Sequence, residues 1–222
     1  KKSRKEGLRR RRMNRNLSKG LNKLFLSQLF NFIGAGAAVF GSTFLAAGLL
    51  VTSSHHLTLG SAMTKLLAGL GIVSLVGAVV LIIGGLLQMI GLWQCGKADS
   101  RFKGLFCLCI AAEAAYVILS FFNIDTMTLS GLFRQAVGLL SLVLAISALK
   151  DSGSYELAER GNRVLKIFFG MCLASAASYV LTIFGSFGSV LQTPFLFIST
   201  ILSIWYAIAC IRFFGKSSKA FA

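Results

Sequence analysis

Histidine and recognisable catalytic motifs are scarce in this sequence. Only two histidines occur, His55 and His56, and they are neighbours in a polar stretch. Because no apolar stretch contains a histidine, an intramembrane serine–histidine pair and the HExxH metal motif are both excluded. The glycine-rich, lysine-containing loop that cradles phosphates is also missing. We therefore expect a protein that is not an enzyme and that carries no cofactor and no metal.

Charge is scarce as well, whereas long apolar runs are abundant. Only 14% of the residues are charged and 55% are hydrophobic, with a mean hydropathy of +0.76. A soluble domain of 222 residues has too small an interior to bury so many apolar side chains. Six runs are long enough for a helix to cross a bilayer, at about 24–50, 66–94, 105–122, 131–149, 164–185 and 192–214. The sequence predicts an all-α transmembrane bundle of six spans.

Acidic residues number seven against 23 basic ones, and the basic residues are unevenly placed. Segments on one side of the six predicted spans hold 21 of them, and segments on the other side hold only Lys65 and Arg134. This is the positive-inside pattern, so we expect both termini in the cytoplasm and a multi-pass protein of the bacterial inner membrane. Topology accounts for the charge, and no nucleic acid partner is expected. The five cysteines are expected at the cytoplasmic ends as free thiols: Cys95, Cys107, Cys109, Cys172 and Cys210.

The predicted organisation has three parts. Residues 1–23 form a basic cytoplasmic segment that would lie against anionic lipid head groups, residues 24–214 form the membrane domain, and 215–222 form a cytoplasmic tail. Because Met13 follows a run of arginines, we hypothesise that residues 1–12 are over-read leader. The longest cytoplasmic loop, 150–163, is predicted to contain a short helix that stops at Gly161.

An internal repeat relates two predicted hairpins. Residues 103–121 match 166–184 at eight of 19 positions, and 85–97 resembles 138–150. Spans 2–3 and 4–5 therefore look like parallel copies of one hairpin around a cytoplasmic loop.

Small residues recur at helical spacing in the first two spans. Since lipid gives helices no hydrophobic reason to associate, close approach across small side chains holds such bundles together. The predicted packing residues are Gly34, Ala38, Ser42 and Ala46 in span 1, and Gly77, Gly84 and Gly91 in span 2. Packing within the chain is the first interpretation, and docking of a partner's membrane helices against span 1 is the alternative.

One carboxylate, Glu113, lies in the middle of the third run. An acid at the centre of a span is costly, so we expect it to face protein and to have a partner. Tyr116 and Arg134 complete this candidate polar site. Three interpretations stay open: a protonated Glu113 hydrogen-bonded to backbone, an ion pair with Arg134, and a proton- or cation-responsive site.

The segment Gly91–Lys103, GLWQCGKADSRFK, resembles a cytoplasmic loop of small, uncharacterised bacterial membrane proteins. That resemblance covers spans 2–3 and implies no activity, so the first hypothesis is a non-enzymatic accessory or assembly subunit. Size, six spans and the small-residue stripe of span 1 are also similar to the substrate-capturing subunits of energy-coupling-factor vitamin importers. The alternative is therefore a small-solute transporter or the substrate-binding subunit of an importer.

Overall fold

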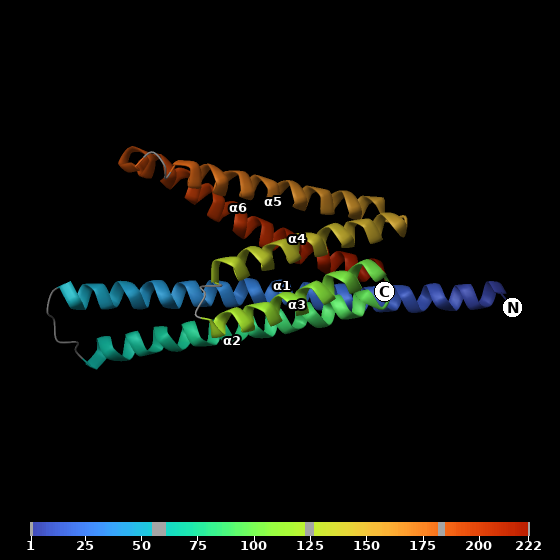
Figure 1. Ribbon diagram of the computed structural model, residues 1–222, viewed down its shortest axis with the longest axis horizontal. Coiled ribbons are helices and arrows are strands. Elements are labelled where there is room, and N and C mark those ends of the chain that lie inside the picture. The colour runs from blue at the N-terminus through green and yellow to red at the C-terminus, as the bar shows by residue number, and fades with distance from the viewer. Residues whose placement is uncertain (1, 55–60, 123–126, 182–184, 222) are drawn as a thin grey trace. The chain divides into compact units, whose positions relative to one another are not determined.

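The computed structural model describes residues 2–54, 61–122, 127–181 and 185–221, and these residues form six α-helices with no strand (Figure 1). The helices are α1 Lys2–Ser54, α2 Ser61–Gly96, α3 Ser100–Phe121, α4 Met127–Asp151, α5 Tyr155–Leu181 and α6 Gly185–Ala220. The all-α prediction is confirmed, and each predicted span falls largely on a helix of its own. Helix α1 continues without a break through position 23, so the basic segment and the first apolar run belong to one helix.

Among the described residues, three helices are long and apolar enough to cross a membrane, within the segments Met13–Phe44, Ala68–Gly96 and Pro194–Ala220. The most apolar of them, Ala68–Gly96, reaches a mean hydropathy of 2.7 over a stretch that is only 11% buried. Large side chains on its surface include Leu75 and Ile82, which are 67% and 64% exposed. Apolar faces of this extent are unfavourable in water and favourable in a bilayer. A helical membrane protein has these properties.

The chain divides into two compact units, and the smaller one is Leu26–Gln88. Within it, α1 and α2 approach so closely that backbone touches backbone. A methyl group added at Gly77 would lie 2.6 Å from the backbone nitrogen of Ala38 and 2.9 Å from the carbonyl oxygen of Gly34. At Gly41, it would lie 2.7 Å from the nitrogen of Ser74. Glycine is needed at these positions because only a hydrogen atom fits there.

The larger unit, Lys1–Phe25 with Met89–Ala222, has its own hydrophobic core. All six helices contribute to it through alternate ends: α1, α3 and α5 through residues in their first halves, α2 and α6 through residues in their second halves, and α4 from Val137 onward. Its most completely buried large side chains are Leu21, Leu24, Leu92, Phe102, Leu142, Leu149 and Phe214. Successive helices of this unit therefore run in alternate directions through one core.

The turn between α4 and α5 is closed by a glycine. Gly153 has a φ of 83°, a conformation that side chains disfavour. Its N–H donates to the carbonyl of Lys150 at 3.0 Å, and the Ser154 N–H donates to the carbonyl of Leu149 at 2.9 Å. This pair of bonds is the Schellman motif, which satisfies the last carbonyls of α4.

The prediction that a short loop helix stops at Gly161 is wrong, because α5 begins at Tyr155 and runs through that position to Leu181. A side chain at Gly161 would collide with Ile146 of α4 and Phe213 of α6. The glycine serves close helix packing rather than helix termination.

Candidate functional site

Helices α3 and α4 meet along an antiparallel seam that is polar at both ends. At one end Arg101 of α3 reaches Ser147 and Asp151 of α4. At the other end the rings of Tyr116 and Phe133 lie edge to face, with centroids 6.0 Å apart. Buried apolar side chains, among them Leu105 and Ala145, occupy the length between.

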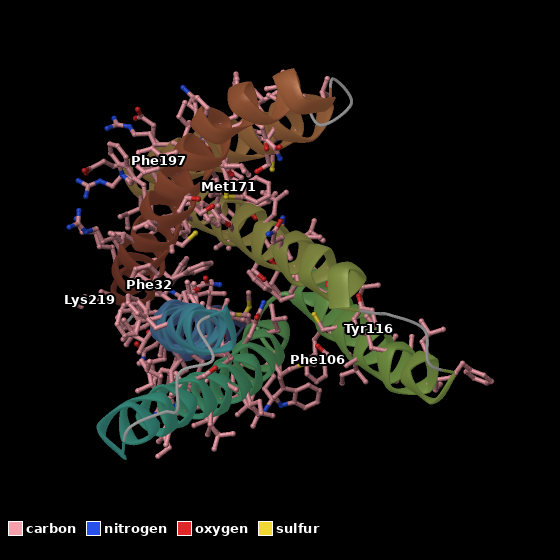
Figure 2. All side chains as sticks on the ribbon, turned by 90° about the vertical axis from the view of Figure 1, so that its left-hand side faces the viewer. Phe32, Phe106, Tyr116, Met171, Phe197 and Lys219 are labelled. Carbon is pink, nitrogen blue, oxygen red and sulfur yellow. The ribbon has the colours of Figure 1, made fainter. Side chains whose placement is uncertain are left out.

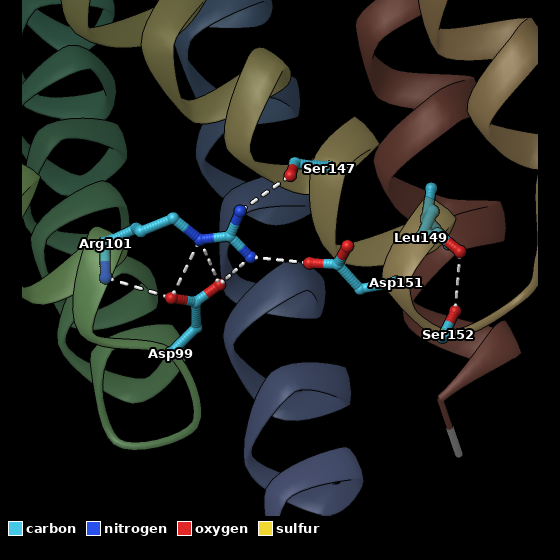
Figure 3. Close-up of polar contacts among 6 residues, drawn as sticks. All are labelled: Asp99, Arg101, Ser147, Leu149, Asp151 and Ser152. Atoms are coloured by element: carbon cyan, nitrogen blue, oxygen red, sulfur yellow. Dashed lines mark hydrogen bonds and ion pairs between the residues drawn. The ribbon is translucent and has the colours of Figure 1, made fainter.

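The first end is a four-residue clamp centred on Arg101 (Figure 3). Its guanidinium donates from Nε to Asp99 Oδ2 at 2.9 Å, from Nη1 to Ser147 Oγ at 2.7 Å and from Nη2 to Asp151 Oδ2 at 2.8 Å. The Arg101 backbone N–H also donates to Asp99 Oδ1 at 2.9 Å. Asp99 therefore acts as the N-cap of α3, by accepting from the Arg101 backbone, and as a counter-charge to the Arg101 side chain. The planar guanidinium suits the second role because it can donate to a carboxylate from more than one nitrogen. The clamp joins the α2–α3 turn to the last turn of α4.

The electrostatics of the clamp favour the ionised carboxylate. Partial burial alone would raise the pKa of the Asp99 carboxyl, but the hydrogen bonds from Arg101 outweigh it and hold that pKa below its ordinary value. The hydrogen bonds to Asp99 and Asp151 likewise raise the pKa of Arg101. Because the Arg101 and Asp151 side chains are 45% and 65% exposed, water screens this half of the clamp. It fixes geometry more than it adds stability.

The second end of the seam contains the predicted polar site. Glu113 is half-buried, one helical turn before Tyr116, and neither side chain is without a partner. Position 134 directly follows Phe133, so the antiparallel register places its backbone level with about residue 115, roughly 3 Å along the axis from Glu113. The Arg134 side chain lies outside the described residues, and its ion pair with Glu113 stays a prediction. Tyr116 lies on the face of α3 that meets α4 (Figure 2), and Glu113 lies one helical turn before it.

The clamp was not predicted from the sequence. Asp99 and Arg101 both belong to the segment GKADSRFK that carries the resemblance described above. Their spacing of two residues matches an aspartate that caps a helix and binds the side chain of the second helical residue. That pattern was a readable signal, but nothing local indicated that Asp151, 50 positions later, would complete the set.

The predicted packing residues divide between the two units and the surface. In Leu26–Gln88, Gly34, Ala38 and Gly77 come together, and Gly84 lies against the side chain of Asn31. Asn31 Nδ2 donates to Ser27 Oγ of the same helix, α1, in a long hydrogen bond of 3.5 Å. Ser42 and Ala46 are exposed.

The remaining small residues lie in the larger unit. Gly91 meets the Leu24 side chain and the Gly20 carbonyl, so the start of α1 packs directly on the end of α2. A side chain at Gly20 would in turn collide with Cys95, which is fully buried.

A row of hydroxyl groups joins α5 to α6. Ser175 Oγ and Ser199 Oγ share a hydrogen bond of 2.7 Å, and Ser203 donates to the Ser199 carbonyl at 2.8 Å. Nearby, the Phe168 and Tyr206 rings lie 5.3 Å apart. Hydroxyl pairs of this kind give specific helix–helix contacts in a medium that offers no water.

The described thiols bring no further chemistry together. Cys95, Cys109 and Cys210 are buried, Cys107 and Cys172 are exposed, and all five are free. Within the described part of the chain, no three His, Cys, Asp or Glu side chains form a group that could hold a metal ion. His55 and His56 lie outside the described residues.

Comparisons of this chain with protein-family models, with curated proteins and with solved structures find no match.

Proposed function

We propose that this chain is a non-enzymatic, six-span protein of a bacterial inner membrane, with both termini in the cytoplasm. The observation that carries the proposal is the core of the larger unit, which gathers the beginnings of α1, α3 and α5 and the ends of α2, α4 and α6. The segments that adjoin this core hold 21 of the 23 basic residues. Alternating helix direction and one-sided charge together fit a topology in which α1, α3 and α5 begin in the cytoplasm and α2, α4 and α6 end there.

Within that membrane, we propose an accessory or assembly role in which the chain acts through its helix faces. Support comes from the pair α1–α2 in Leu26–Gln88, whose glycines face one another and whose outward faces are apolar. Val39, Phe40 and Leu75 are 63%, 54% and 67% exposed. Such faces fit lipid chains or the membrane helices of a partner, and the proposed partner contacts span 1. The basic start of α1 would contact anionic lipid head groups.

Site-specific photocrosslinking in the native membrane tests the accessory role. A photoreactive residue in place of Phe40 should give a covalent adduct of one defined mass. The same residue in place of Trp205 on α6, which is 61% exposed, provides a lipid-facing control and should give none. Lipid-only labelling at both positions would refute docking through α1.

Threading is tested separately by reporter fusions. A reporter that is active only in the cytoplasm should be active after residue 222 and silent after Ser54 or Asn123. Activity at either of the latter two positions would overturn the six-span topology without bearing on partner docking.

The α3–α4 seam favours transport as a second function, either by the chain alone or as the membrane subunit of an importer. In the proposed six-span threading, Glu113 would lie within a span and the ion-paired clamp at the cytoplasmic end of the same helix pair. An acid within a span is a feature of proton- and cation-coupled transporters. Co-purification from native membrane with an ATPase would support this function. Glu113→Gln that leaves pH-dependent uptake intact would exclude a coupling role for this acid.

A further inference from the structure

The first and last membrane helices meet at their basic ends. Ser18 Oγ of α1 donates to the Ser218 carbonyl of α6 at 2.7 Å, although 200 positions separate them in sequence. Farther along, the Phe25 ring lies 3.2 Å from the point where Gly215 would carry a side chain. Position numbers rise on α1 as they fall on α6, so the two segments are antiparallel neighbours. Both segments lie within the larger unit.

Each of these two segments carries a row of three cations on the face opposite the core. The rows follow helical spacing of three to four residues, so each stays on one face. The buried residues of both helices belong to the same core. The opposite faces of these two neighbouring helices therefore both lie on the outside of that core. The rows are Arg15, Lys19 and Lys23 on α1, and Arg212, Lys216 and Lys219 on α6; five of these side chains are exposed and Lys23 is half-buried.

No acid lies among these rows or next to them in sequence, and the one acid of α1, Glu6, precedes Arg15 by nine positions. Residues 13–54 and 185–221 contain no aspartate or glutamate. The ion pairs among the described residues lie elsewhere, at Arg101, Arg160 and Arg163. Figure 2 shows Lys219 on the side of α6 away from Tyr116 and Phe106, so this basic face is distinct from the α3–α4 seam.

The position of the two rows along their helices suits a membrane surface. The apolar run of the first span begins at about residue 24, and that of the last span ends at about residue 214. Both rows therefore lie at or beside the level at which apolar chain gives way to polar chain. Cations placed there attract the phosphates of anionic lipids.

We infer that the α1 and α6 rows form one binding site for a phospholipid whose head group carries two phosphates. Packed helices lie about 8–10 Å apart from axis to axis. Each row extends over roughly 10 Å along its helix. A head group with two phosphates can place one phosphate on each row, whereas a head group with one phosphate neutralises one row only. The inference deepens the lipid contact proposed above, since α6 supplies half of the site, and it rests on the proposed membrane location.

Lipid titration of the purified full chain in detergent, followed by native mass spectrometry, tests the site. Cardiolipin is the two-phosphate probe, and phosphatidylglycerol at equal total phosphate is the one-phosphate control. The unaltered chain should retain one cardiolipin in preference to phosphatidylglycerol. Lys216→Gln with Lys219→Gln should weaken cardiolipin binding roughly 30-fold, the equivalent of about 1 kcal/mol for each cation at 1.4 kcal/mol per tenfold change.

Matched variants separate this site from general attraction between charges. Lys150→Gln with Lys166→Gln removes the same charge from exposed positions outside the α1 and α6 rows and should leave cardiolipin binding unchanged. Lys216→Arg with Lys219→Arg keeps the charge and should retain binding, which also shows that the changed positions tolerate substitution. Because one ligand bridges both rows, adding Arg15→Gln and Lys19→Gln to the α6 pair should cost less than the sum of the separate losses.

The inference would be overturned by equal weakening in the Lys150 and Lys166 control, or by equal retention of the two lipids. Additive losses from the α1 and α6 variants would likewise show two independent sites in place of one. Detergent titration does not depend on how the chain is threaded. A failed topology test would therefore contradict the proposed function without affecting the lipid-binding result. A failed lipid titration would contradict the lipid site without affecting the proposed topology.

Discussion

The closest backbone approach in Leu26–Gln88 predicts how two chemically identical substitutions on one helix will differ. At Gly77 an added methyl group would lie 2.6 Å from the Ala38 nitrogen, whereas at Gly85 it would meet nothing within 4 Å. Both glycines lie in the interior of α2, so replacement by alanine gains about 1 kcal/mol of helix propensity at each. At Gly77 the two helices must also separate, because real Cβ atoms do not approach backbone so closely.

The difference between the two variants isolates the cost of that separation. Forcing an extra carbon into a well-packed contact costs about 1–3 kcal/mol. Gly85→Ala should therefore be neutral to stabilising, and Gly77→Ala should be about 1–3 kcal/mol less stable than Gly85→Ala. Helix α1 offers the same comparison, because Gly41 meets the Ser74 backbone and Gly36 meets nothing within 4 Å.

Equilibrium unfolding in mixed micelles of mild detergent and SDS measures the stability of all four variants under one condition. Far-UV circular dichroism is a poor probe because helices persist in SDS. A donor–acceptor dye pair on α1 and α2 reports the separation of the helices directly. Equal midpoints for Gly77→Ala and Gly85→Ala would refute the claim that backbone contact holds this pair together.

Three further predictions concern the polar groups and thiols. Since the pKa of Asp99 is lowered in the folded chain, its contribution to stability is present above the unfolded value near pH 4 and is lost as pH falls through the folded value; in acid unfolding, Asp99→Asn should flatten this loss, and an unchanged acid transition would contradict it. If Glu113 pairs with Arg134, changing both to glutamine should cost less stability than the sum of the single changes, and strict additivity would rule out the pair. A membrane-impermeant maleimide should leave intact cells unlabelled and reach Cys107 only after lysis, so labelling from outside would refute a cytoplasmic location.

Helix positions could be predicted from the sequence because the signal for them is local. A run of about 18 or more apolar residues defines a helix wherever it occurs in a membrane chain, and the described helices follow those runs. Which faces meet is harder to predict. Four-residue spacing from Gly34 suggested Ser42 and Ala46, yet the face that meets α2 continues through Gly41, because a helix turns once every 3.6 residues and a four-residue row drifts around it.

The site was predictable only in part for the same reason. Glu113 could be singled out because a lone acid in an apolar run is conspicuous, and Tyr116 followed from helical spacing. The clamp needs Asp151, and the contact between α1 and α6 needs Ser218, neither of which any local pattern connects to its partner. Such pairings depend on how whole helices pack, which one sequence does not encode at a fixed spacing.

The contact between the first and last helices also sets an order on biosynthesis. Leu21 and Leu24 leave the ribosome early, whereas Phe213 and Phe214, which belong to the same buried core, emerge nearly the whole chain later. Until then the glycine-lined pair α1–α2 can form by itself, because its contacts are local, while the common core stays open. A chain stalled before residue 210 would therefore keep the α1–α2 contacts but lack the α6 side chains that complete the larger core.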